Sequence, residues 1–118
     1  MTIPTPGQPA RGSRSGRPIM VLLDLLGRRT ALRILWELSL AGGPLTFRGL
    51  QAAAETNPNV LNARLKELRG AGLVDHGTEG YRLSGGGTAL LAVVLPLNKW
   101  ADDWAATREF SSDLPEGG

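Results

Sequence analysis

The sequence of 118 residues has the length of one compact domain, and its 42% hydrophobic residues suffice for a single core. It contains no cysteine, which excludes disulfides, thiolate metal sites, a cysteine nucleophile and thiol-based redox sensing, and its only histidine is His76. No catalytic site, metal site or cofactor is predicted, because no general acid and base or ligand cluster can be assembled around one histidine. We therefore expect a protein that is not an enzyme.

The formal net charge of +2 is unevenly distributed along the chain. Arginines concentrate in residues 1–48, whereas acidic residues dominate residues 99–118. This asymmetry suits a protein with one face toward polyanionic DNA, although a solvated surface with charged tails would give the same pattern. No apolar run is long enough to span a membrane and no secretory signal is evident, so a soluble, cytoplasmic protein is expected.

Composition divides the chain into three parts. Residues 1–16 are rich in Pro, Gly, Ser and Thr and carry basic residues, which predicts a disordered basic N-terminal arm. Residues 107–118 are predicted to be a flexible C-terminal tail for the same reason. The folded domain is then residues 17–106.

Three helices are predicted in the first half of this domain. The first begins at Pro18, which suits a first helical turn, and ends at Gly27. Thr30 is the expected N-cap of a second helix that stops at Gly42–Gly43. Thr46 is the expected N-cap of a short third helix that runs to about Ala54.

The pair Asn57-Pro58 gives the clearest helix start in the sequence. A residue before proline avoids helical backbone angles, and an asparagine side chain can accept hydrogen bonds from free backbone amides. Asn57 is therefore the N-cap of a fourth helix that starts at Pro58 and runs to about Gly70, with Gly72 as its left-handed stop. The apolar stripe of this helix consists of Leu61, Leu65 and Leu68.

A hairpin and a last helix complete the domain. Leu73–Gly77 and Gly80–Leu83 are two short extended runs around a glycine-containing turn. Ser84 is the expected N-cap of the last helix, which should bend at Pro96 and continue to Trp104.

This order of elements is typical of a winged helix-turn-helix, which has a short helix, a three-residue turn, a longer helix and then a hairpin. The predicted fold is therefore mainly α with a small β-hairpin wing. In that arrangement the helix beginning at Pro58 enters the major groove of double-stranded DNA. At about 100° per residue, the face opposite its leucines holds Asn59, Val60, Ala63, Lys66 and Glu67, flanked by Asn62 and Arg64.

These side chains suit the reading of DNA. The asparagines can pair with adenine, Val60 and Ala63 can touch thymine methyl groups, and Arg64 can reach guanine or a phosphate. Each of them can equally be an ordinary surface residue. The full set of predicted DNA-binding residues is Thr46, Arg48, Asn57, Asn59, Val60, Asn62, Ala63, Arg64, Lys66, His76 and Arg82.

Two tryptophans four residues apart, Trp100 and Trp104, form a large apolar surface that a small domain has difficulty covering. We expect the terminal helices to form a homodimer, although the tryptophans could instead cover the monomer's own core. The predicted interface residues are Ile19, Leu22, Leu23, Leu26, Leu91, Leu95, Trp100 and Trp104.

Several segments, in order, resemble the HxlR family of bacterial transcriptional regulators. They are residues 17–35, Gly43-Pro-Leu-Thr-Phe-Arg48-Gly-Leu50, Leu61-Asn-Ala-Arg64-Leu-Lys66-Glu-Leu68, Gly72-Leu73-Val74, and Tyr81-Arg-Leu83-Ser84 followed by Gly87, Leu90 and Trp100. The resemblance implies a winged-helix homodimer, built through the first and last helices, that binds an operator. The family usually has cysteine where this chain has Arg17, tryptophan where it has Thr30, and a longer wing tip. A looser, MarR-like membership would also fit these differences.

The leading hypothesis is therefore a repressor that binds a pseudo-palindromic operator as a homodimer. Residues 44–83 carry only a small excess of basic over acidic side chains, which leaves room for a winged-helix protein–protein interaction module without DNA binding. A third alternative is a regulator that responds to an unidentified small-molecule effector bound between the core and the terminal helix.

Overall fold

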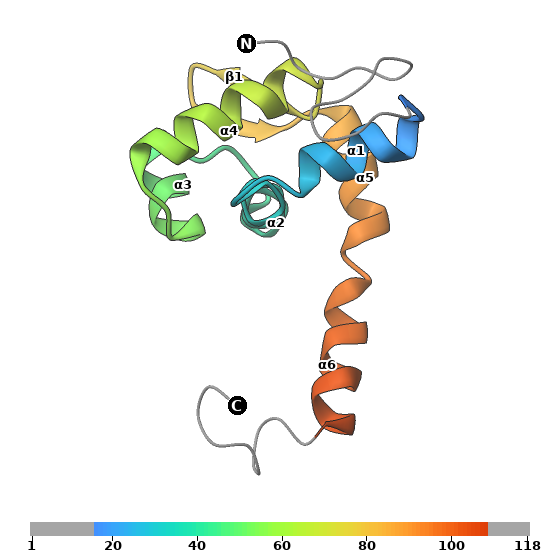
Figure 1. Cartoon of the computed structure of the whole chain (residues 1–118). Coiled ribbons are helices and arrows are strands. Elements are labelled where there is room, and N and C mark those ends of the chain that lie inside the picture. Colours follow the sequence, from blue (N-terminus) through green and yellow to red (C-terminus); the bar gives the residue numbers. More distant parts are fainter. Residues whose placement is uncertain (1–15, 109–118) are drawn as a thin grey trace.

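The computed structural model describes residues 16–108 of the chain (Figure 1). Along this part the secondary-structure elements are α1 (Pro18–Leu26), α2 (Ala31–Ala41), α3 (Phe47–Ala54), α4 (Pro58–Gly70), β1 (Val74–Gly77), β2 (Gly80–Leu83), α5 (Gly85–Val94) and α6 (Leu97–Thr107). Residues 1–15 of the predicted arm and residues 109–118 of the predicted tail lie outside the described residues. The order of helices and strands is that of a winged helix-turn-helix, as the sequence predicted.

Side-chain caps start three of these helices. The Thr46 hydroxyl accepts a hydrogen bond from the Gly49 amide at 3.0 Å, and Oδ1 of Asn57 accepts one from the Val60 amide at 2.8 Å. Ser84 accepts one from the amide of Gly87 at 3.0 Å. Each bond satisfies an amide that has no partner within the first helical turn. The three predicted caps are confirmed.

The prediction that Thr30 is the N-cap of α2 is confirmed for its position but not for the role of its side chain. Thr30 occupies the N-cap position but makes no side-chain cap bond, and its backbone is left-handed with φ of 73°. A capping side chain needs the extended backbone that Thr46 and Asn57 have. Thr30 instead supplies a left-handed residue to the short α1–α2 turn, in which the Ala31 amide donates to the carbonyl of Arg28 at 3.0 Å.

The predicted last helix is two helices. α5 ends at Val94 and α6 begins at Leu97, with Pro96 between them. Proline has no amide hydrogen to donate to the preceding turn, so the helix breaks there and does not merely bend. Beyond the break α6 projects away from the rest of the molecule (Figure 1).

The core lies between α2, α3, α4, α5 and β1. Its central side chains are those of Ile34, Leu35, Leu50, Leu61, Leu65, Leu68, Val74 and Leu91. Leu91 is 1% exposed and packs inside this core, so the expectation that it lies at a dimer interface is not supported by its position. The core residues come from α5 as well as from the helix-turn-helix, so α5 is packed against the helix-turn-helix.

The wing is a two-stranded antiparallel hairpin, in which His76 pairs with Tyr81. Leu45 adds a bridge beside it, because its amide and carbonyl both bond to Tyr81, at 2.9 and 2.8 Å. Gly80 has φ of 131°, and a Cβ atom there would overlap the carbonyl of Leu45. Glycine is therefore required for the close approach that ties the wing to the segment before α3.

Within residues 16–108, none of the helices combines the length and the apolar composition needed to cross a membrane.

Candidate nucleic-acid interface

The turn of the helix-turn-helix is braced from α2. Arg33 donates through Nη2 to the carbonyl of Ala53 at 2.9 Å and places Nη1 3.7 Å from the carboxylate of Glu55 in the turn. The hydrogen bond from Nε to Glu37, at 2.8 Å, is the main reason why the pKa of Arg33 is raised, with the nearby charge of Glu55 adding to it. Arg33 thus fixes the end of α3, and with it the point where α4 begins.

One stripe of α4 is open to solvent. Asn59, Asn62, Lys66 and Arg69 are all exposed, and their spacing of three and four residues puts them on one face of the helix. Two amides and two cations in a row are suitable for adenine pairing near the helix start and phosphate contact near its end. Three of the four were predicted as DNA-binding residues. Arg69 was not, although its position three residues after Lys66 was the available signal.

The remaining predicted residues of α4 lie at the margin of this stripe or away from it. Val60 and Ala63 are half-buried. Glu67 was placed on the exposed face, and this is wrong, because it is 2% exposed. The sequence pattern identified the leucine stripe correctly, but it gave no sign that a carboxylate would be buried beside it.

Glu67 is buried because two arginines neutralise it. Oε2 of Glu67 accepts a hydrogen bond from Nη1 of Arg28 at 3.0 Å, and Oε1 lies 3.2 Å from Nε of Arg64. Arg28 also donates to Asp24 at 3.1 Å. Burial acts to lower the pKa of Arg28, but the bonds and charges of Asp24 and Glu67 outweigh it, so that this pKa is raised. Two arginines and two carboxylates thus form a charge-balanced cluster, called here the Glu67 cluster.

Arg64 belongs to this cluster and not to the open stripe. Its side chain is 20% exposed, and Nε faces Glu67 without the alignment of a hydrogen bond. The direct DNA contact predicted for Arg64 therefore has less geometric support than contacts from Lys66 or Arg69.

The other predicted DNA-binding residues surround α4. Arg48 is exposed on the first turn of α3, and Thr46 and Asn57 are exposed residues whose oxygens cap α3 and α4. The Asn57 amide nitrogen is still a donor that can serve a phosphate.

The wing supplies the last two candidates. His76 and Arg82 are exposed on β1 and β2, and the His76 ring stacks on Tyr81 with the centroids 3.9 Å apart and an interplanar angle of 4°. This stacking holds the imidazole in a defined position at the edge of the wing.

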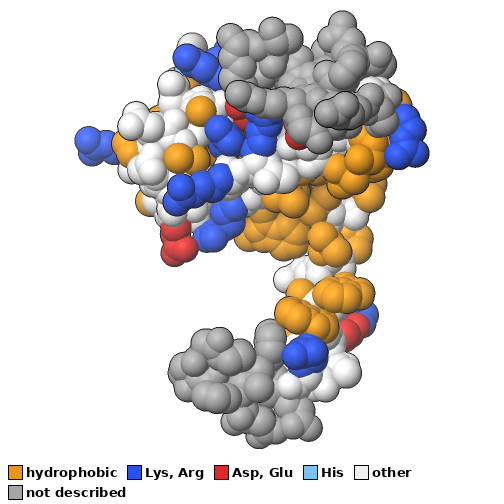
Figure 2. All heavy atoms as spheres, in the orientation of Figure 1, with side chains coloured by type: hydrophobic (Ala, Val, Ile, Leu, Met, Phe, Trp, Pro, Cys, Tyr) orange, Lys and Arg blue, Asp and Glu red, His pale blue; other side chains and the backbone are white. Residues whose placement is uncertain are grey.

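Cationic and hydrophobic side chains gather on different parts of the surface. Figure 2 shows Lys and Arg side chains over the part of the molecule that holds the helix-turn-helix, and a broad hydrophobic area on the side toward α5 and α6. Among the predicted interface residues, Ile19, Leu23, Leu95, Trp100 and Trp104 are exposed, whereas Leu22 and Leu26 are half-buried.

The tryptophans pack on each other and not on the core. Their ring centroids are 5.8 Å apart, and Trp100 and Trp104 are 61% and 43% exposed. Within the described residues 16–108, the two tryptophans therefore do not cover the monomer's own core, which was the alternative to a dimer interface. A large apolar surface is left open on α6.

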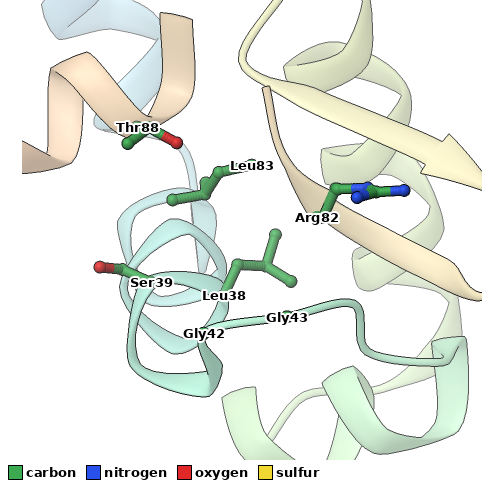
Figure 3. A pocket seen from close by; sticks show the side chains of 7 residues that line it. All are labelled: Leu38, Ser39, Gly42, Gly43, Arg82, Leu83 and Thr88. Atoms are coloured by element: carbon green, nitrogen blue, oxygen red, sulfur yellow. The ribbon is translucent and has the colours of Figure 1, made fainter. Parts of the chain in front are cut away.

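A pocket of about 300 Å³ lies between α2, β2 and α5 (Figure 3). The residues lining it are Leu38, Ser39, Gly42, Gly43, Arg82, Leu83 and Thr88. Figure 3 shows the guanidinium of Arg82 directed away from the other lining side chains, which leaves two leucines and two hydroxyl groups around the opening.

Three comparisons with known proteins bear on these features. The solved structure of quinone-bound YodB from B. subtilis is similar to this chain, with a TM-score of 0.64 and 31% sequence identity, over 72% of this chain and 96% of that one. No curated protein matches the chain at a significant level. The family model of HxlR-like helix-turn-helix proteins matches residues 25–109, which include the whole helix-turn-helix, the wing and α6. The chain therefore belongs to the HxlR-like helix-turn-helix family.

Proposed function

We propose that this protein is a bacterial transcriptional repressor that binds a pseudo-palindromic operator in the cytoplasm as a homodimer. The observation that carries the proposal is the open stripe of Asn59, Asn62, Lys66 and Arg69 on α4. The stripe lies on the second helix of the helix-turn-helix, which is the helix that enters the major groove in proteins of this fold. Membership of a helix-turn-helix regulator family supports the same reading.

The exposed apolar residues of α1 and α6 support a homodimer. Both helices expose large hydrophobic side chains to solvent, namely Leu97, Trp100 and Trp104 on α6 and Ile19 and Leu23 on α1. Such a surface is costly in water and is typical of a contact with another protein. A two-fold axis would present two copies of α4 to successive major grooves, with half-site centres about 10 bp apart.

The test is selection of an operator from random DNA, followed by gel shifts with the selected site and an unrelated duplex over a range of salt concentrations. Operator binding predicts affinity that falls steeply as salt increases, because each phosphate contact releases a counterion. A winged-helix module that binds only proteins would select no sequence and would show no such salt dependence on DNA.

Response to a small-molecule effector is a second candidate, supported by the pocket between α2, β2 and α5. The YodB structure carries a quinone, which makes quinones reasonable first compounds to test. Because this chain contains no cysteine, a quinone could not be held by a thiol adduct. Thermal shift of the protein with and without a quinone tests this, and a quinone that raises the Tm should also change operator affinity.

A further inference from the structure

The burial of Glu67 is the feature of α4 that operator binding does not explain. A carboxylate is rarely buried unless it is paired, and Glu67 is 2% exposed between Arg28 and Arg64. Its partners come from different parts of the fold, because Arg28 lies in the α1–α2 turn and is itself bonded to Asp24 of α1. The Glu67 cluster therefore joins α4 to the first helix.

The cluster coincides with a shift of the face that α4 exposes. At about 100° per residue, the centre of the open stripe of Asn59, Asn62, Lys66 and Arg69 lies about 65° around the helix axis from the direction opposite Leu61, Leu65 and Leu68. The shift is away from Glu67 and Arg64. A helix oriented by its leucines alone would expose Ala63 and Glu67 and would move Asn62 and Arg69 toward the margin.

We infer that Glu67 is a positioning residue for DNA recognition, which holds α4 rotated about its own axis so that Asn59, Asn62, Lys66 and Arg69 face the major groove. Arg28 anchors Glu67 to α1 through Asp24, and Arg64 closes the cluster from within α4. Glu67 itself needs no contact with DNA. This inference rests on the proposed operator binding for its consequence, but the rotation of the helix can be measured without DNA.

Thiol labelling measures the rotation directly, since the chain has no cysteine of its own. Asn62→Cys and Ala63→Cys are made separately in the full chain, and the rate of maleimide labelling is measured for each. The exposed position 62 should label faster than the half-buried position 63. In a Glu67→Gln background, the ratio of the two rates should shift several-fold in favour of position 63.

A role in stability alone gives a different result. If Glu67→Gln only loosens the fold, both positions label faster by a similar factor and their ratio is unchanged, which overturns the inference. Glu79→Gln is the matched control, because it also removes one negative charge from the domain but at an exposed side chain in the hairpin turn that is not part of the Glu67 cluster. If Glu67→Gln does not fold, Asp24→Asn is used to weaken the far end of the cluster, and the same shift of the ratio is expected.

DNA binding provides the second readout. Glu67→Gln should reduce the preference for operator over unrelated DNA by roughly tenfold, the effect of losing one base contact, and Glu79→Gln should not. A preference equal to that of the wild type, together with a shifted labelling ratio, would overturn the link to recognition. A wild type that binds no DNA would refute the proposed function, and the labelling ratio would still decide whether Glu67 sets the rotation of α4.

Discussion

Arg28 and Glu67 are 39 residues apart in the chain, yet Nη1 of Arg28 lies 3.0 Å from Oε2 of Glu67 in a partly buried ion pair. The pair connects the turn after α1 with the C-terminal half of α4. Removing one partner of a buried pair leaves an uncompensated charge, whereas replacing both partners by apolar side chains of similar size can be neutral or stabilising.

This difference gives the first prediction. Glu67→Ala should lower the free energy of unfolding by about 1–3 kcal/mol, because Arg28 and Arg64 lose the carboxylate they share while Arg28 keeps Asp24 as a partner. The double variant Arg28→Met/Glu67→Met should lose much less. Urea denaturation followed by circular dichroism measures both. Equal losses for the single and double variants would show that shape, and not charge pairing, holds this region together.

The asparagines of the open stripe are expected to read sequence. Asn59→Ala and Asn62→Ala should each change the preferred base at an adenine of the operator, at a cost of about 1–3 kcal/mol in discrimination. Titration of each variant against the operator and against duplexes altered at one base pair measures this. A double asparagine variant that binds every duplex as the wild type does would show that the stripe does not face the bases.

The cations of α4 are expected to differ in their dependence on salt. Lys66→Ala and Arg69→Ala should each reduce the slope of log K against log salt by about 1, because each removes one phosphate contact. Arg64→Ala should leave the slope nearly unchanged and lower the midpoint of thermal unfolding instead, since Arg64 is paired with Glu67. A slope reduced by Arg64→Ala and not by the other two would restore the sequence-based expectation that Arg64 contacts DNA.

The tryptophans of α6 are expected to hold the dimer. Trp100→Ala/Trp104→Ala should convert a dimer into a monomer in sedimentation equilibrium and should weaken binding to a whole operator more than to a half-site. Lys99→Ala is a suitable control, because it removes only an exposed pair with Asp103 on the same helix. A wild type that is monomeric at micromolar concentrations and binds a half-site as well as a whole one would contradict the dimer.

The local chemistry of the sequence determined most of the secondary structure. Asn57-Pro58 and Thr46 fixed the starts of α4 and α3, because a proline and a capping side chain act on the backbone within one turn. Gly80 and the extended runs beside it were enough to locate the wing, and the order of elements then indicated the fold. Periodicity was likewise sufficient for the buried leucines of α4, because their burial follows from spacing alone.

The tertiary structure decided what depends on partners distant in the chain. Glu67 is a surface residue by periodicity, and it is buried only because Arg28 is brought to it from the α1–α2 turn. The left-handed backbone of Thr30 is not specified by any property of a threonine, because β-branched side chains rarely adopt it. In the sequence, Leu91 looks the same as the apolar residues of α1 and α6 that are exposed in the structure. The sequence pattern shows which residues are hydrophobic, but it does not show which of them another helix covers. Local capping acts over three or four residues, whereas burial and charge pairing are set by which helices pack together.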